Sequence, residues 1–334
     1  MPNPADLTVV AHALVSDERG ILAADESVAT MSARLTAERI TPSESNRRDY
    51  RELLLTAPGL DETVSGIILC DETFRQDLSS GETFPVAARR LGILPGIKVD
   101  AGTQPFDGAS TATVTTGLDG LADRLAEYAA LGAAFAKWRA VIDVADPDQG
   151  ALTANAEALA EYAALCQQHG IVPIVEPEVL CSGSHDLSTC ADVTMMALTL
   201  VFDRLQDRGV DLSGIVLKPN MVTPGLESAD APAPPLVIAE ATLAVLAETV
   251  PSEVPGIAFL SGGHTNQAAC QNLGAINQDA GDAPWQLTYS FGRALVSDAL
   301  HAWAGAPGFV AVAQTRLLNN CRRASAATRR PVAV

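Results

Sequence analysis

Eight short apolar segments recur along the chain, and the intervals between them constrain its fold more than any other feature. Their first residues lie 30 to 46 residues apart, which leaves room for a helix after each segment. Near-continuous apolar runs of this length are typical of parallel strands that are covered on both faces. The expected strands are residues 20–25, 66–70, 96–100, 134–142, 171–180, 214–222, 256–261 and 286–291.

The stretches between the expected strands carry helical patterns. Three of these patterns end just before a glycine, and they occupy residues 118–131, 153–169 and 190–208. A glycine beyond the last turn supplies the left-handed cap that ends many helices. Alternating strands and helices predict a parallel sheet, and eight such units favour its closure into a (β/α)8 barrel.

An open doubly wound sheet is the alternative arrangement of strands and helices. That fold usually carries a glycine-rich turn after its first strand, whereas residues 24–30 here read ADESVAT and contain no glycine. We therefore expect one α/β domain over residues 1–334, a (β/α)8 barrel. A Pro-rich loop over residues 231–236 should lead into a helix, and the basic C-terminal stretch predicts a short irregular tail from about residue 319.

The composition excludes several classes of function. Twenty-two Lys and Arg against 40 Asp and Glu give a net charge of −18, which disfavours partners such as nucleic acid and anionic membrane surfaces. No apolar run approaches the roughly 18 residues of a membrane span, and the N-terminus lacks the pattern of a signal peptide. Six cysteines without CxxC spacing are typical of reduced thiols in the cytoplasm. Because the histidines show no HxH or HxxxH spacing, we expect neither a metal nor another cofactor.

Lysine is rare in this chain, and its three positions are unusual. Among the 22 basic residues only Lys98, Lys137 and Lys218 are lysines, and all three lie in apolar, strand-like surroundings. Arginine cannot replace an amine that has to lose its proton, since guanidinium stays charged while the ammonium pKa shifts on burial. This distribution predicts amine chemistry in the interior of the fold.

Charged residues gather at one end of the expected strands. Active sites of parallel barrels form there, from several strands at once. Residues two positions apart on a strand share a face, so we expect the pair Lys137 and Arg139 and the pair Glu176 and Glu178 to point into the barrel mouth. Lys137 could then act as the cation that activates Lys218, and paired carboxylates could move protons. A purely structural ion network is the alternative. The residues are Asp25, Lys98, Asp100, Lys137, Arg139, Glu176, Glu178 and Lys218.

Glycines follow the last two expected strands. Residues Ser261, Gly262 and Gly263 come after the seventh strand, and Gly292 and Arg293 come after the eighth. Barrels often bind phosphate between these two loops, where backbone N–H groups and an arginine can contact its oxygens. The coincidence of the two loops predicts a phosphate site.

The motifs GILAADES, GIKVD, FAKWR, IVPIVEPE, LKPNMVTPG, FLSGG and PWxLTYSFGRAL occur in this order. From about Glu18 to about Ala304 the sequence resembles class I fructose-bisphosphate aldolase. The resemblance implies a (β/α)8 barrel that reversibly cleaves fructose 1,6-bisphosphate to dihydroxyacetone phosphate and glyceraldehyde 3-phosphate. It also implies a Schiff-base lysine, no metal, a phosphorylated sugar as substrate and a homotetramer.

The resemblance assigns a role to each matching residue. Lys218 would form the Schiff base, with Lys137 as its charge-stabilising neighbour. Glu176 would be the general acid and base, Glu178 its partner, and Asp25 would steer the reacting carbonyl and hydroxyl groups. Arg139 would clamp the substrate. The 6-phosphate would be held by Ser27, Thr30, Arg34 and Lys98, and the 1-phosphate by Ser261, Gly262, Gly263, Gly292 and Arg293.

Two departures from the family pattern bear on this expectation. Animal members end in a tyrosine that helps protonate the enamine, whereas the last tyrosine here is Tyr289, and Thr30 stands where the family commonly has serine. The absence of a terminal tyrosine leaves open which group protonates the enamine and whether fructose 1,6-bisphosphate or fructose 1-phosphate is preferred, whereas Thr30 keeps the hydroxyl group and should change little. A Schiff-base aldolase for another phosphosugar and a non-enzymatic interaction protein on the same scaffold are the alternatives, which a cleavage assay would separate.

Overall fold

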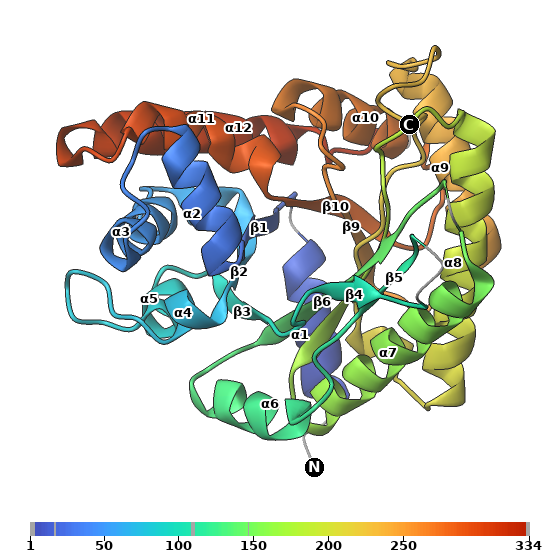
Figure 1. Ribbon diagram of the computed structural model, residues 1–334, viewed down its shortest axis with the longest axis horizontal. Helices are drawn as coiled ribbons and strands as arrows, with labels where there is room; N and C mark the ends of the chain where they lie inside the picture. Colours follow the sequence, from blue (N-terminus) through green and yellow to red (C-terminus); the bar gives the residue numbers. More distant parts are fainter. Residues whose placement is uncertain (1–3, 17, 108–110, 146, 332–334) are drawn as a thin grey trace.

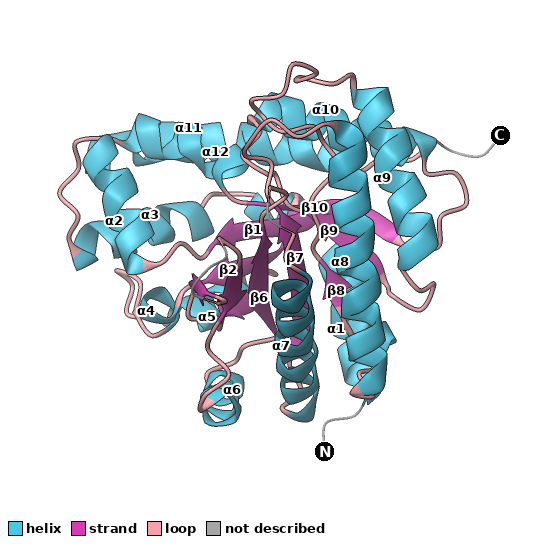
Figure 2. Cartoon of the chain, turned by 45° about the vertical axis from the view of Figure 1, so that its right-hand side comes forward, coloured by secondary structure: helices cyan, strands magenta, loops and turns pink. Residues whose placement is uncertain are grey.

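All eight predicted strands are present in the computed structural model, which describes residues 4–16, 18–107, 111–145 and 147–331. They close into one parallel barrel in the order β1-β10-β9-β8-β7-β6-β3-β2 (Figure 2). The prediction of a single (β/α)8 domain is thereby confirmed. The barrel strands are β1 (Gly20–Ala24), β2 (Val64–Leu69), β3 (Leu94–Lys98), β6 (Phe135–Ile142), β7 (Val172–Val179), β8 (Val216–Leu217), β9 (Gly256–Phe259) and β10 (Gln286–Phe291).

Strand β8 is much shorter than the expected residues 214–222. Gly214 still belongs to a 3-10 turn, and Pro219 has no N–H group to donate to a neighbouring strand. Pairing nevertheless continues past the strand, because the Lys218 N–H donates to the carbonyl of Val175 at 2.8 Å. This hydrogen bond fixes the backbone of Lys218 directly after the end of the strand.

Helices surround the barrel, with α2–α5, α11 and α12 on one side and α7–α9 on the other (Figure 1). None of the helices in the described residues is long and apolar enough to cross a membrane. The helices are α1 (Pro4–Val15), α2 (Val28–Ala37), α3 (Glu44–Leu55), α4 (Asp71–Phe74), α5 (Phe84–Arg90), α6 (Leu121–Ala130), α7 (Gln149–Gln168), α8 (Leu187–Asp207), α9 (Pro235–Thr249), α10 (Asn266–Asp279), α11 (Arg293–Trp303) and α12 (Val310–Ala326), with 3-10 turns η1 (Leu60–Glu62), η2 (Leu212–Gly214) and η3 (Pro307–Phe309).

The C-terminal segment corrects the expectation of an irregular tail from about residue 319. Helix α12 continues through that point to Ala326 and buries Leu317, Cys321 and Ala324. These residues recur at helical spacing, so they form an apolar stripe that packs on the neighbouring helices. Burial of this stripe outweighs the basic composition from which the tail was expected.

A small antiparallel sheet of β4 (Thr103–Pro105) and β5 (Thr113–Thr115) follows β3 and was not predicted. Buried Asn155 of α7 holds it in place: the side chain accepts from the Thr115 N–H at 3.0 Å and donates to the Thr113 carbonyl at 2.8 Å. The Thr115 hydroxyl in turn donates to the carbonyl of Arg139 on β6. The sheet is thus attached to the barrel beside the ends of β3 and β6.

Helix α1 closes the end of the barrel at which the strands begin. Its Leu7, Ala11 and Leu14 pack with inward-facing side chains of the strands in one apolar cluster. The Phe135 ring fills the space that Gly96 leaves, since a Cβ on that glycine would lie 2.2 Å from the ring. The described interior at this end is therefore apolar and closely packed.

Candidate active site

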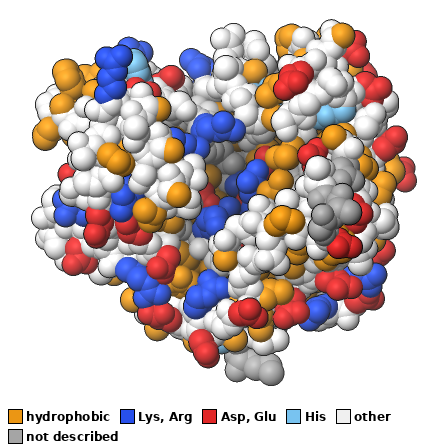
Figure 3. All heavy atoms as spheres, viewed as in Figure 1, with side chains coloured by type: hydrophobic (Ala, Val, Ile, Leu, Met, Phe, Trp, Pro, Cys, Tyr) orange, Lys and Arg blue, Asp and Glu red, His pale blue; other side chains and the backbone are white. Residues whose placement is uncertain are grey.

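A cavity of about 1010 Å³ opens at the carboxyl ends of the barrel strands. Figure 3 shows a hollow in the middle of one face in which Lys and Arg atoms gather, although the chain carries a net charge of −18. All fifteen site residues expected from the sequence line this cavity. They are Asp25, Ser27, Thr30, Arg34, Lys98, Lys137, Arg139, Glu176, Glu178, Lys218, Ser261, Gly262, Gly263, Gly292 and Arg293.

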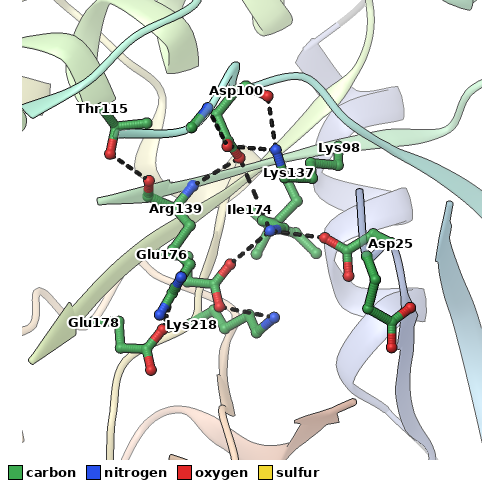
Figure 4. A network of polar contacts seen from close by, with 12 residues as sticks. Asp25, Lys98, Asp100, Thr115, Lys137, Arg139, Ile174, Glu176, Glu178 and Lys218 are labelled. Atoms are coloured by element: carbon green, nitrogen blue, oxygen red, sulfur yellow. Dashed lines mark hydrogen bonds and ion pairs between the residues drawn. The ribbon is translucent and has the colours of Figure 1, made fainter. Parts of the chain in front are cut away.

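Glu176 stands between two lysines at the centre of the cavity (Figure 4). Its Oε1 lies 3.0 Å from the Nζ of Lys218, and its Oε2 lies 3.2 Å from the Nζ of Lys137. The Nζ of Lys137 also lies 2.8 Å from Oδ2 of Asp25. The four side chains come from four different strands: Lys137 and Glu176 lie within β6 and β7, and Asp25 and Lys218 directly follow β1 and β8. The two lysines and Glu176 are buried, and Asp25 is 13% exposed.

The electrostatics of this cluster favour charged Asp25 and Lys137. Burial disfavours the ionised form of Asp25, but the neighbouring Lys137 and Lys218 outweigh it and hold its pKa well below the usual range. Burial also opposes the charge on Lys137, and here Asp25 and Glu176 outweigh it and raise the pKa of Lys137 above its ordinary value. Lys137 is therefore a permanent cation beside Glu176 near neutral pH.

A second cluster lies at the ends of β3, β6 and β7. Arg139 forms an ion pair with Glu178, and Lys98 forms one with Asp100. The other carboxylate oxygen of Asp100 accepts the Arg139 backbone N–H at 3.3 Å and lies 3.9 Å from the Nζ of Lys137. Asp100 therefore connects the two clusters.

The loops after β9 and β10 lie together at one side of the cavity. Gly262 and Gly263 have positive φ angles of 51° and 81°, which glycine adopts without strain. A Cβ on Gly263 would lie 3.7 Å from Nη2 of Arg293, so the SGG loop is adjacent to that arginine. Gly292 caps α11 without any side-chain hydrogen bond. Backbone N–H groups at such a helix start are suited to bind an anion.

The remaining expected residues lie where β1 leads into α2. Ser27 caps this helix, accepting the Thr30 N–H at 3.2 Å, and the two hydroxyl groups lie 3.0 Å apart. Arg34 lies one turn further and forms an ion pair with Glu26. This wall of the cavity offers two exposed hydroxyl groups and a guanidinium.

The sequence did not indicate Glu26 or Arg51 as functional residues, and it placed Asp100 at the active-site end of its strand without giving it a role. Glu26 and Asp100 line the cavity, and Arg51 lies behind it as the partner of Glu26. Glu26 stands in the sequence between two expected site residues, a position that could have identified it. Nothing in the local sequence around Arg51 indicates its partner, because the two residues come from separate elements.

The described residues contain no group of three or more His, Cys, Asp or Glu arranged to hold a metal ion. The chemistry available to the cavity is instead that of two adjacent amines, a bridging carboxylate and a surrounding set of cations. Such a set can bind an anionic substrate, form a covalent bond through an amine and transfer protons.

Comparison with known proteins finds relatives that match nearly the whole chain. Residues 6–331 match the family model of class-I fructose-bisphosphate aldolase. The chain is 50% identical over 312 residues to "Fructose-bisphosphate aldolase 6, cytosolic" of Arabidopsis thaliana, covering 93% of this chain and 87% of that protein. It is 46% identical over 319 residues to "Fructose-bisphosphate aldolase 2" of Caenorhabditis elegans, covering 95% and 87% respectively.

A solved structure is also closely similar. It is a ternary co-crystal structure of fructose-bisphosphate aldolase from Plasmodium falciparum in complex with TRAP and a small-molecule inhibitor. The TM-score is 0.94 at 41% sequence identity, and the match covers 98% of this chain and 96% of the other. The structural comparison and the sequence comparisons thus both match fructose-bisphosphate aldolases.

Proposed function

The chain belongs to the class I fructose-bisphosphate aldolase family, and from this membership we propose that it cleaves fructose 1,6-bisphosphate through an imine on Lys218. Members of this family are carbon–carbon lyases. The observation that carries the assignment of Lys218 is the position of Glu176, which contacts the amines of Lys218 and Lys137 at the same time.

The unequal surroundings of the two lysines support Lys218, rather than Lys137, as the nucleophile. Lys137 contacts Asp25 and Glu176 and lies near Asp100, whereas Glu176 is the carboxylate that pairs with Lys218 in the part of the chain that the structure describes. More negative charge therefore surrounds Lys137, which holds its proton. In this proposal Lys218, which has fewer carboxylates around it, is the amine that attacks the carbonyl carbon.

The proposed reaction begins when the neutral Lys218 amine attacks the C2 carbonyl of the open-chain sugar. Glu176 delivers a proton to the resulting hydroxyl group, which leaves as water and gives a protonated imine. The electrons of the C3–C4 bond then move toward the imine as a base takes the C4 hydroxyl proton, and glyceraldehyde 3-phosphate is released. Protonation of the enamine at C3 and hydrolysis of the imine release dihydroxyacetone phosphate and restore Lys218.

The two anion-binding walls match the two phosphates of the substrate. In this proposal the 1-phosphate lies against Ser261, Gly262, Gly263, Gly292 and Arg293, and the 6-phosphate lies against Ser27, Thr30, Arg34 and Lys98. The charged cluster between the walls places the reacting carbons beside Lys218. Asp25 and Arg139 then contact the hydroxyl groups of the sugar, with Glu178 orienting Arg139.

Borohydride reduction in the presence of dihydroxyacetone phosphate tests the imine directly. The expected result is one covalent adduct on the peptide that contains Lys218, with EDTA present throughout and without effect. Lys98→Met is the matched control, because Lys98 lines the same cavity but pairs with Asp100, and its adduct should still form on Lys218. No adduct, or an adduct on another lysine, would reject the assignment.

Two further features follow from the family and are proposed with it. The chain would assemble as a homotetramer, which light scattering of the purified protein would measure. It would act in the cytoplasm, in keeping with the names of its cytosolic relatives, and fractionation of the source cells would test this.

A further inference from the structure

Glu26 lies on the wall of the cavity between two arginines. Its Oε1 forms an ion pair with Nη1 of Arg34, and its Oε2 lies 2.6 Å from Nη2 of Arg51. The same Nη2 of Arg51 also approaches the Glu26 carbonyl oxygen at 3.4 Å. One carboxylate that is 9% exposed is therefore shared by two guanidinium groups.

The two arginines differ in their access to the cavity. Arg51 comes from α3, its side chain is 2% exposed, and its Nη1 donates to the Sδ of Met31 at 3.2 Å. Arg34 comes from α2, its side chain is 26% exposed, and it lines the cavity. Arg51 is thus a fixed partner of Glu26, whereas Arg34 can turn from Glu26 to a ligand without crossing the protein interior.

The fixed partner determines what the release of Arg34 costs. A carboxylate left buried without any counter-charge is strongly unfavourable, so Glu26 alone would hold Arg34 tightly. With Arg51 in place, Glu26 keeps one charge-assisted hydrogen bond after Arg34 has left. Burial disfavours the charge on Arg51, but Glu26 outweighs it and raises the pKa of Arg51, so this partner stays charged.

We propose that Glu26 and Arg51 are positioning residues that set the affinity of the cavity for the second phosphate of the substrate. Glu26 occupies Arg34 in the free protein and competes with phosphate for it. Arg51 weakens that competition by remaining on Glu26 when Arg34 turns away. This inference rests on the proposed function, because it takes Arg34 as a ligand of the 6-phosphate.

The arrangement predicts opposite effects from substitutions of two residues that contact each other. Glu26→Gln removes the competing charge but keeps an oxygen for Arg51, so the KM for fructose 1,6-bisphosphate should fall about 3-fold. Arg51→Met leaves Arg34 as the charged partner of Glu26, so this KM should rise about 10-fold. A merely structural role would change KM in the same direction in both variants.

Substrate choice supplies the specificity test. Fructose 1-phosphate has no 6-phosphate, so its KM should stay within about 2-fold of the parent value in both variants. Inorganic phosphate as a competitive inhibitor of fructose 1,6-bisphosphate cleavage should bind more tightly to Glu26→Gln and more weakly to Arg51→Met. In an Arg34→Met background, neither substitution should change these values further.

A matched control is available on the same helix. Arg47 of α3 forms a two-point ion pair with Glu72, at 2.7 and 2.6 Å, and neither residue lines the cavity. Glu72→Gln should therefore leave both KM values unchanged. If this control shifts them as Glu26→Gln does, or if Glu26→Gln and Arg51→Met move them in the same direction, the inference is wrong.

Failure of the inference and failure of the proposed function give different results. If the parent protein forms no adduct on Lys218 and cleaves neither sugar, the proposed function is wrong, and the inference that depends on it is rejected too. If the parent cleaves both sugars but the KM values do not separate as described, the inference alone is wrong. Should Arg51→Met not fold, Glu26→Gln decides, and an unchanged or higher KM for the bisphosphate rejects the inference.

Discussion

The two ends of the barrel are built from the same strands but differ completely in chemistry. Along β6, Phe135 lies in the apolar cluster beneath the cavity, whereas Lys137 and Arg139 line the cavity. Along β7, Ile174 belongs to the same apolar cluster and Glu176 to the charged one. Two residues, or about 7 Å of strand, therefore separate packing from chemistry.

This contrast shows how the fold can bury several charges. Side chains at the closed end pack against α1 and supply stability through burial of apolar surface. Ionised groups at the open end are individually costly to bury and are accepted because they pair with one another. Substitutions at the open end should therefore remove activity, and those at the closed end should remove stability.

The largest effect is expected from Lys218→Arg at the open end. Arginine preserves a positive charge beside Glu176 but cannot form an imine, so kcat for fructose 1,6-bisphosphate should fall by about 10⁴-fold or more. A cleavage assay measures this, and circular dichroism serves as the control that the variant is folded. Turnover above one-tenth of the parent rate would contradict the assignment of the catalytic amine to the open end.

Phe135→Ala should give the largest effect at the closed end. Loss of this fully buried ring should cost about 3–5 kcal/mol in the free energy of unfolding, since Gly66 and Gly96, which face it, have no side chains to fill the space. Urea unfolding measures the change, and Phe309→Ala is the control because Phe309 is 52% exposed. Equal losses in the two variants would contradict the close packing described for this end.

Gly96→Ala sharpens the same point with a single methyl group. Its Cβ would lie 2.2 Å from the Phe135 ring, so overpacking should cost about 1–3 kcal/mol in the free energy of unfolding. Gly308→Ala is the matched control, since a Cβ there meets nothing within 4 Å. Phe135→Leu combined with Gly96→Ala should recover part of the loss, and no recovery would show that the ring is not the obstacle.

The smallest expected effect is a pH dependence of stability, which should appear for a charged residue at the open end and not for an apolar residue at the closed end. Because the pKa of Asp25 is lowered in the folded protein, its stabilising contribution is present above the unfolded value of about 3.9 and is lost as pH falls through the folded value. The difference in unfolding free energy between the parent and Asp25→Asn should therefore shift against the parent below about pH 4, by up to about 1.4 kcal/mol per pH unit. Denaturant unfolding between pH 3 and 6 measures it.

The corresponding difference for Phe135→Leu should stay constant over the same pH range, because no charge is involved. A flat profile for Asp25→Asn would show that the carboxylate gains no stabilisation from Lys137. A sloping profile for Phe135→Leu would show that the two ends are coupled electrostatically.

The strands and most of the residues that line the cavity could be predicted from the sequence, because the change from apolar to charged side chains occurs within a few consecutive residues of each strand. The segment FAKWR, for example, carries both the apolar filling and the charges that line the cavity. Fold, family and activity class were predicted correctly on this basis. The roles of individual site residues remain predictions that the experiments above test.

What escaped prediction depends on contacts between distant segments. The β4–β5 sheet has three-residue strands, too short to show alternation, and it is held by Asn155 some forty residues away. The pairing of Glu26 with Arg51 is equally invisible, because nothing local indicates which carboxylate a given arginine contacts. Helix α12 was missed for another reason. The helical spacing of Leu317, Cys321 and Ala324 indicates a helix, but the basic composition of the segment led to the expectation of an irregular tail.

Helix α1 closes the barrel at the end where the strands begin, so among the described residues the cavity is open only at the other end. Whatever enters at the mouth has to leave by the same route. In the proposed reaction both trioses must therefore pass through the one opening at the carboxyl ends of the strands, and the triose that is not bound to Lys218 can leave while the other is still attached.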